Sequence, residues 1–154
     1  MRPIRLLLIM TVLIIAVAGA ATNGRAGDDL ASLQGTWLTV SLVNDGKILV
    51  DKAVAAKPGP ATKLVYEGHT WKLTFNDKVV ASGSFTIDAA KSPKEIDIMD
   101  RSGVKNKATK LGIYEIDGET YRYCLAPAGK PRPTQFTSEK GSGHSLGVSK
   151  REKP

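Results

Sequence analysis

The 154-residue sequence predicts an all-β protein: an antiparallel, up-and-down β-barrel of about eight strands, preceded by a short N-terminal helical turn. Three observations predict it. Short β-prone segments recur at a spacing of about 8–12 residues. Turn residues separate these segments, and no stretch after residue 20 shows sustained helical periodicity. The segments alternate apolar and polar residues, so each has one apolar face, and closing the sheet into a barrel removes its exposed edges.

Residues 1–20 carry the features of a signal peptide. Arg2 and Arg5 form a positive start, an apolar run follows over residues 6–17, and Ala18-Gly19-Ala20 fits a small-residue cleavage site. The apolar run is shorter than the ~20 residues of a comfortable membrane span, and an uncleaved anchor is the alternative. We therefore expect an exported protein, periplasmic or extracellular, with no stable membrane span after cleavage.

The mature chain is expected to begin at Ala21. Residues 21–27 are small and polar and predict a flexible N-terminus, and residues 28–152 would form the barrel domain. The net charge of the whole chain is +7, and losing Arg2 and Arg5 leaves it at +5. Export makes nucleic acid a poor partner. An acidic envelope component would suit this charge, although a solvated surface explains it as well.

Cys124 is the only cysteine, which excludes an intramolecular disulfide. A domain of this length can bury a core without one. The thiol lies in the strand-like sequence Tyr121-Arg122-Tyr123-Cys124-Leu125, so we expect a half-buried small residue rather than a nucleophile. We also expect a monomer.

The first strand organises the predicted fold. Asp28 or Asp29 can cap a helical turn that ends near Gln34. Gly35 permits a tight turn, and Trp37 lies at the start of a β-prone run whose indole can plug one end of a barrel. The run covers residues 36–43, and Asn44-Asp45-Gly46-Lys47 predicts a turn after it. The Pro-rich region 52–61 predicts a loop.

The remaining strands are expected at residues 63–67, 71–75, 78–87, 95–99, 110–116 and 120–126, with Gln135-Phe136-Thr137 and residues 146–151 supplying the last pairing. Asp117-Gly118 predicts a hairpin between the sixth and seventh strands. In strand 71–75 the alternation places Trp71, Leu73 and Phe75 on one face. In strand 78–87 it places Val79, Ala81, Gly83, Phe85 and Ile87 together.

Four motifs occur in order along the chain: Leu33-Gln34-Gly35-Thr36-Trp37, Gly112-Ile113-Tyr114-Glu115-Ile116-Asp117-Gly118, Cys124-Leu125-Ala126 and Arg132-Pro133-Thr134-Gln135-Phe136. Together they resemble the planctomycete-type lipocalin-like domain family of small exported proteins, over about residues 28–152. The function of that family is not established. The resemblance therefore implies a lipocalin-like barrel and an exported location rather than an activity.

The Gly35-x-Trp37 pattern also resembles the first-strand signature of the wider lipocalins. In those proteins the tryptophan packs at the closed end of the barrel under an arginine from near the end of the chain. Arg151 is the matching position here. The resemblance implies that Gly35, Trp37 and Arg151 are structural anchors, with a cation–π contact worth ~0.5–2 kcal/mol.

We predict no enzymatic activity, no metal site and no cofactor. The two histidines, His69 and His144, lie in turn-like sequence, and no His/Cys/Asp/Glu cluster has metal-ligand spacing. Ser145, His144 and Asp100 could be assembled into a triad, but no nucleophile elbow supports it. The acidic residues alternate with apolar ones or lie in turns, where we expect them to face water rather than act as a catalytic pair.

Two features point to function. One is the aromatic set Trp71, Phe85, Tyr114, Tyr121 and Tyr123, which would line a ligand site or simply fill the barrel if it points inward. The other is the basic loop with Arg101, Lys105, Lys107 and Lys110. It could form a cationic rim with Lys130, Arg132, Lys150, Arg151 and Lys153, depending on how the barrel closes.

The leading hypothesis is a binding module that holds a small apolar or amphipathic ligand in the barrel mouth. The alternative is a protein-interaction or inhibitor-like envelope module that acts through loops and the basic rim, with no internal ligand. A ligand cavity of ~300 Å³ or more would favour the first.

Overall fold

A computed structural model describes residues 26–55, 59–101 and 108–153 of the chain. The predicted signal peptide, Lys105 and Lys107 lie outside the described residues. The elements are α1 (Ala26–Leu33), β1 (Gly35–Asn44), β2 (Lys47–Val50), α2 (Lys52–Ala55), β3 (Thr62–Glu67), β4 (Thr70–Phe75), β5 (Lys78–Asp88), β6 (Lys94–Asp100), β7 (Thr109–Asp117), β8 (Thr120–Leu125) and β9 (Ser145–Arg151).

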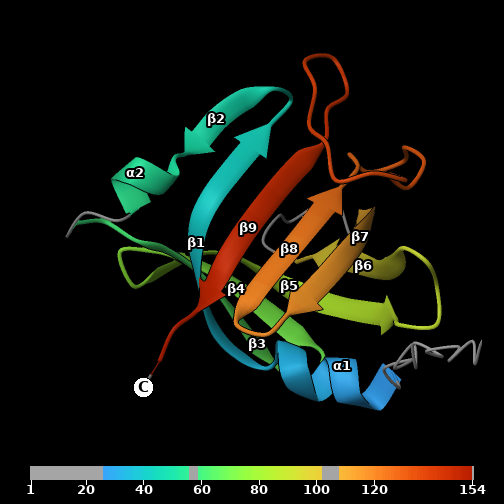
Figure 1. Ribbon diagram of the computed structural model, residues 1–154, viewed down its shortest axis with the longest axis horizontal. Helices are drawn as coiled ribbons and strands as arrows, with labels where there is room; N and C mark the ends of the chain where they lie inside the picture. Colours follow the sequence, from blue (N-terminus) through green and yellow to red (C-terminus); the bar gives the residue numbers. More distant parts are fainter. Residues whose placement is uncertain (1–25, 56–58, 102–107, 154) are drawn as a thin grey trace, which may run out of the picture.

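The strands form a closed, antiparallel, up-and-down barrel. Their order is β2-β1-β3-β4-β5-β6-β7-β8-β9, and a further pairing of β1 with β9 closes eight of them into a ring, leaving β2 as an extra strand. In Figure 1, β9 runs between β1 and β8, and α1 lies below the end where β1 begins and β9 ends. The predicted all-β, lipocalin-like barrel is confirmed. No helix among the described residues is long and apolar enough to cross a membrane.

Trp37 fills the end of the barrel next to α1, which we call the closed end. The residue has no exposed surface, and its indole nitrogen donates to the Leu33 carbonyl over 2.8 Å. The Arg151 guanidinium lies 4.1 Å from the centre of the indole ring and donates to the Gln34 carbonyl over 2.8 Å. Gly35 has a φ of 102°, which glycine adopts readily and other residues do not. The cation–π contact implied by the lipocalin resemblance is therefore present.

A buried polar contact holds α1 against the barrel. The Asp29 carboxylate accepts hydrogen bonds from the Lys94 ammonium over 2.7 Å and from the Tyr114 hydroxyl over 2.8 Å. Leu33 at the end of the helix is fully buried. The helix begins at Ala26, two residues before the expected start of the domain. It is thus a longer element than the single turn that the sequence indicates.

A bulge in β5 overturns part of the expected alternation. Leu73 of β4 pairs with Ala81, but the next residue, Thr74, pairs with Val79, so Val80 has no direct partner. One extra residue in a strand reverses the faces of the residues beyond it. Val79 is accordingly 58% exposed, and the prediction that it shares the inner face with Ala81 and Phe85 is wrong.

Two other expectations fail in the connections. Residues 135–137 form no strand; their segment instead packs on the outside of β8, where the Arg122 guanidinium lies 4.1 Å from the Phe136 ring and the Cys124 thiol donates to the Thr137 carbonyl. Cys124 is fully buried as a result, and burial raises the pKa of its thiol. The sequence analysis also missed β2, and the expected loop 52–61 begins with α2.

Candidate ligand cavity at the open end of the barrel

The barrel contains a cavity of about 200 Å³ in the half away from α1. We call this half the open end. Its aromatic lining residues are Tyr66, Trp71, Tyr121 and Tyr123, and its aliphatic ones are Leu42, Leu64, Leu73, Ala81, Ile98 and Leu125. The polar lining residues are Thr39, Thr62, Asp100, Lys110 and Ser145. Most of the wall is therefore apolar, with a small number of polar groups, as in small-molecule sites generally.

A bulge in β1 sets which of its side chains face the cavity. Thr39 pairs with Ser149 of β9 and Leu42 pairs with Gly147. The two positions are three residues apart on β1 but only two apart on β9, so β1 carries one extra residue between them. Because directly paired residues lie on the same face, this bulge lets both Thr39 and Leu42 point inward.

Glycine at position 147 makes room for the Tyr123 ring. The two residues are paired across β8 and β9, and a Cβ at Gly147 would lie 2.3 Å from the nearest atom of the tyrosine ring. That separation is well inside van der Waals contact, so any larger residue would push the ring out of its place. The Tyr123 side chain thus lies flat over the β9 backbone and forms part of the cavity wall.

The tyrosines of the wall pack against one another. The Tyr66 and Tyr121 rings meet edge to face at 5.7 Å, and their hydroxyl oxygens are 3.0 Å apart in a hydrogen bond. The Tyr121 and Tyr123 rings are 5.5 Å apart. Burial raises the pKa of Tyr66 and Tyr121, and it raises the pKa of Tyr123 to about 12. All three hydroxyls are therefore neutral hydrogen-bond donors at ordinary pH.

Three of the five aromatic residues singled out in the sequence line the cavity, namely Trp71, Tyr121 and Tyr123. The other two lie in the packed half next to the closed end. Phe85 is 1% exposed and its ring is 5.1 Å from that of Tyr66, and the Tyr114 hydroxyl donates a hydrogen bond to Asp29. Sequence reasoning missed Tyr66. The alternation of Leu64 and Tyr66 within the strand was the signal that could have identified it.

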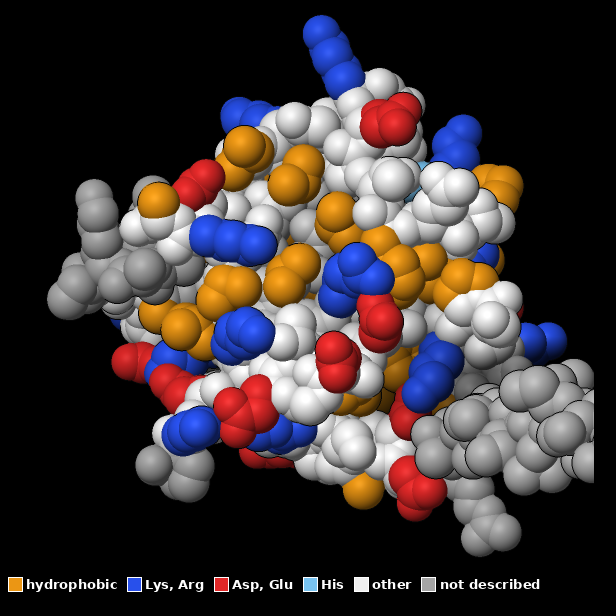
Figure 2. Space-filling view, viewed as in Figure 1, with side chains coloured by type: hydrophobic (Ala, Val, Ile, Leu, Met, Phe, Trp, Pro, Cys, Tyr) orange, Lys and Arg blue, Asp and Glu red, His pale blue; other side chains and the backbone are white. Residues whose placement is uncertain are grey.

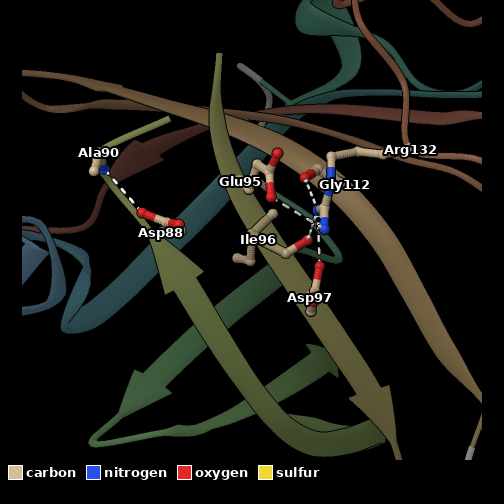
Figure 3. A network of polar contacts seen from close by, with 7 residues as sticks. All are labelled: Asp88, Ala90, Glu95, Ile96, Asp97, Gly112 and Arg132. Atoms are coloured by element: carbon tan, nitrogen blue, oxygen red, sulfur yellow. Dashed lines mark hydrogen bonds and ion pairs between the residues drawn. The ribbon is translucent and has the colours of Figure 1, made fainter. Parts of the chain in front are cut away.

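The wider set of basic residues is divided between the two ends of the barrel. Arg101 follows β6 and Lys110 lies at the start of β7, both at the open end, where Lys110 lines the cavity. Arg151 lies at the opposite, closed end. Figure 3 shows Arg132 reaching over β6, where its guanidinium lies 2.7 Å from Asp97 and 3.4 Å from Glu95. It also donates to the Gly112 carbonyl over 2.6 Å, so it fastens the connection between β8 and β9 to the barrel wall.

The candidate triad has a different hydrogen-bond pattern from the one that catalysis requires. The Ser145 hydroxyl donates to the Asn44 side chain over 3.0 Å rather than to a histidine.

The other histidine, His69, is not part of this triad. It lies near the closed end, with its ring 6.1 Å from that of Phe85. Within the described part of the chain, no group of three or more His, Cys, Asp or Glu side chains could hold a metal ion.

Large apolar side chains are exposed at the open end. They include Ile48 and Leu49 on β2, and Phe75, Val79 and Val80 at the β4–β5 hairpin. Figure 2 shows that, on the face that carries β1, β2 and β9, apolar side chains are interleaved with charged ones. This mixed surface differs from the inner wall, where the described lining is largely apolar.

Comparisons of the chain with protein-family models, curated proteins and solved structures found no match. The resemblance to the planctomycete-type lipocalin-like family stays a prediction that rests on the four motifs. Because a barrel of this kind can serve many functions, function has to be argued from the cavity and its chemistry.

Proposed function

We propose that the protein is an exported binding module that holds one small, largely apolar molecule in the open end of its barrel. The observation that carries this proposal is the cavity of about 200 Å³, walled by aromatic and aliphatic side chains. Protein interiors are normally packed with few voids larger than a water molecule. A space of this size at the open end of the barrel is therefore suited to a ligand.

The cavity volume limits the ligand. At about 200 Å³ it is below the ~300 Å³ that the sequence analysis gave as favouring a ligand binder, and typical ligand pockets have volumes of about 300–1,000 Å³, so only a small guest would fit. An apolar cavity of about 150 Å³ accommodates benzene, which makes a guest of roughly eight non-hydrogen atoms a reasonable fit here. A longer amphipathic molecule would insert one end and leave the other end at the mouth beside Asp100 and Lys110.

Export is part of the proposal, and the features of residues 1–20 support it. N-terminal sequencing of the protein recovered from outside the cytoplasm of its own host should give a start at Ala21. A start at Met1 would contradict cleavage.

The binding proposal is tested by native mass spectrometry of the protein purified gently from its own host. We expect a bound mass that denaturation releases. Replacing Ala81 by Phe should fill the cavity and abolish the bound mass, because Ala81 lines it. Val79→Phe is the matched control, since it adds the same ring to the same strand on the exposed outer face. A bare protein whose interior also excludes hydrophobic fluorescent probes would overturn the proposal.

A second candidate is an envelope interaction module with no internal ligand. The exposed Ile48 and Leu49 on the extra strand β2 favour it, because exposed apolar surface is a common feature of protein contacts. An acidic partner protein is the kind that the net charge of +5, which remains once Arg2 and Arg5 are removed from the +7 of the whole chain, would attract. In this case the Ala81→Phe variant should retain partner binding in a pull-down from its host, whereas Ile48→Lys should lose it.

A further inference from the structure

Some hydroxyl groups in the cavity wall have hydrogens that the hydrogen bonds of the described residues do not use. The Tyr66 and Tyr121 hydroxyls share one hydrogen bond, which uses the hydrogen of only one of them. Tyr123 lines the same wall, with its hydroxyl oxygen over the β9 backbone at Gly147. The Thr39 side chain, 2% exposed, has a hydroxyl without a partner in the described chain. Buried polar groups are normally satisfied, so the unused hydrogen of the Tyr66–Tyr121 pair and the Thr39 hydroxyl call for an acceptor.

The inner part of the cavity disfavours a charged acceptor. The charged lining residues are Asp100 and Lys110, which lie at the open-end limits of β6 and β7. Tyr66 and Tyr121 lie nearer the closed end, since Tyr66 pairs with Gly35 and the Tyr121 ring is 5.5 Å from that of Trp37. The lining around them includes the apolar Leu64, Trp71 and Ile98. The same desolvation that keeps the hydroxyls of Tyr66 and Tyr121 protonated would penalise a carboxylate placed beside them.

We propose that the cavity selects a small neutral carbonyl compound, whose oxygen accepts hydrogen bonds from the tyrosine hydroxyls of the wall. This inference rests on the proposed function and specifies its ligand class. A carbonyl oxygen has two lone pairs and can accept from two donors, and it brings no hydrogen that would need an acceptor of its own. A ketone or ester group inserted first leaves the apolar remainder of the molecule against the aliphatic wall.

Three compounds of nearly the same shape test the inference: acetophenone, α-methylstyrene and benzoate. They differ only in whether the group attached to the ring is a ketone, a hydrocarbon or a carboxylate. Titration calorimetry with the protein purified from its own host and stripped of any bound molecule would measure each affinity. We expect acetophenone to bind roughly three- to tenfold more tightly than α-methylstyrene, which is the contribution of one hydrogen bond. Benzoate should bind on the order of a hundredfold more weakly than acetophenone, or not measurably.

Tyr123→Phe removes one of the donors and keeps the ring. In this variant the preference for acetophenone over α-methylstyrene should fall toward equal affinity, while α-methylstyrene binds as before. Tyr114→Phe is the matched control, because Tyr114 carries the same chemical change outside the cavity. It should keep the full preference for acetophenone. If either variant does not fold, the comparison of the three compounds on the unaltered protein still decides the question.

The outcomes separate this inference from the proposed function. Equal binding of acetophenone and α-methylstyrene by the unaltered protein would overturn the choice of a carbonyl ligand and leave a small-molecule cavity in place. Tightest binding of benzoate would also overturn it and would indicate an anion held at Lys110. Binding of none of the three would count against both the inference and the proposed function.

Discussion

Trp37 is held by contacts from two directions at the closed end. Its indole nitrogen bonds to Leu33 in α1, and Arg151 from β9 stacks on its ring. Trp37→Ala would remove a fully buried ring and leave a void. It would also remove the hydrogen bond that the indole nitrogen donates to the Leu33 carbonyl. We expect the free energy of unfolding to fall by about 3–5 kcal/mol, measured by urea denaturation.

The matched control for that change is Trp37→Phe, which keeps an aromatic ring under Arg151 and should cost less. An unchanged midpoint for Trp37→Ala would refute the view that this indole anchors the barrel.

The structural role of Trp37 could be predicted from the sequence, because a glycine, a tryptophan and a late arginine at these positions resemble a known pattern. Thr39 carried no such pattern, because its inward position depends on the bulge in β1 and on pairing with the distant strand β9.

At the scale of the element, α1 depends on one buried carboxylate. Asp29 accepts from Lys94 of β6 and Tyr114 of β7, and its neighbour Asp28 is exposed. Asp29→Asn removes the charge from both hydrogen bonds and leaves the Lys94 ammonium without its ion pair. We expect thermal or urea unfolding to show a loss of about 1.5–3 kcal/mol, the range for hydrogen bonds to charged groups.

Asp28→Asn gives the control, because it makes the same change one residue earlier on the exposed side of the helix. It should alter the free energy of unfolding by about 0.5 kcal/mol or less. Equal effects of the two substitutions would mean that the charge acts through the helix terminus in general and not through the buried contact with β6 and β7.

The strands and their order follow from residue periodicity and turn signals, but the bulges do not. Alternation correctly predicts which residues of β5 face inward from Ala81 onward. Between Ala81 and the β4–β5 hairpin, the extra residue Val80 reverses the alternation, so that Val79 faces outward. A bulge is decided by pairing with the neighbouring strand, which a pattern within a single segment does not contain. Residues 135–137 show the same limit: a β-prone sequence lies against Arg122 and Cys124 instead of pairing with a strand.

For the whole molecule, the four tyrosines make stability fall at alkaline pH. Burial raises the pKa of Tyr66, Tyr114 and Tyr121 above the ordinary value of 10.0, and that of Tyr123 to about 12. Above pH 10 the unfolded chain loses these protons while the folded chain keeps them. Folding is then opposed by up to about 1.4 kcal/mol per pH unit for each tyrosine, and the full stability is present only below pH 10.

A domain with a stability of about 5–15 kcal/mol should therefore unfold within a few pH units above 10. We expect the tyrosinate absorbance to rise in one cooperative step that coincides with loss of the far-ultraviolet circular dichroism signal, because the buried hydroxyls ionise only when the barrel opens. Occupation of the cavity by a neutral ligand should move this step to higher pH, since the ligand stabilises the folded state in which Tyr121 and Tyr123 are protonated. A gradual rise in tyrosinate absorbance near pH 10 with the dichroism intact would show that the hydroxyls are hydrated in the folded barrel, and would contradict the desolvated inner wall on which the proposed ligand selectivity depends.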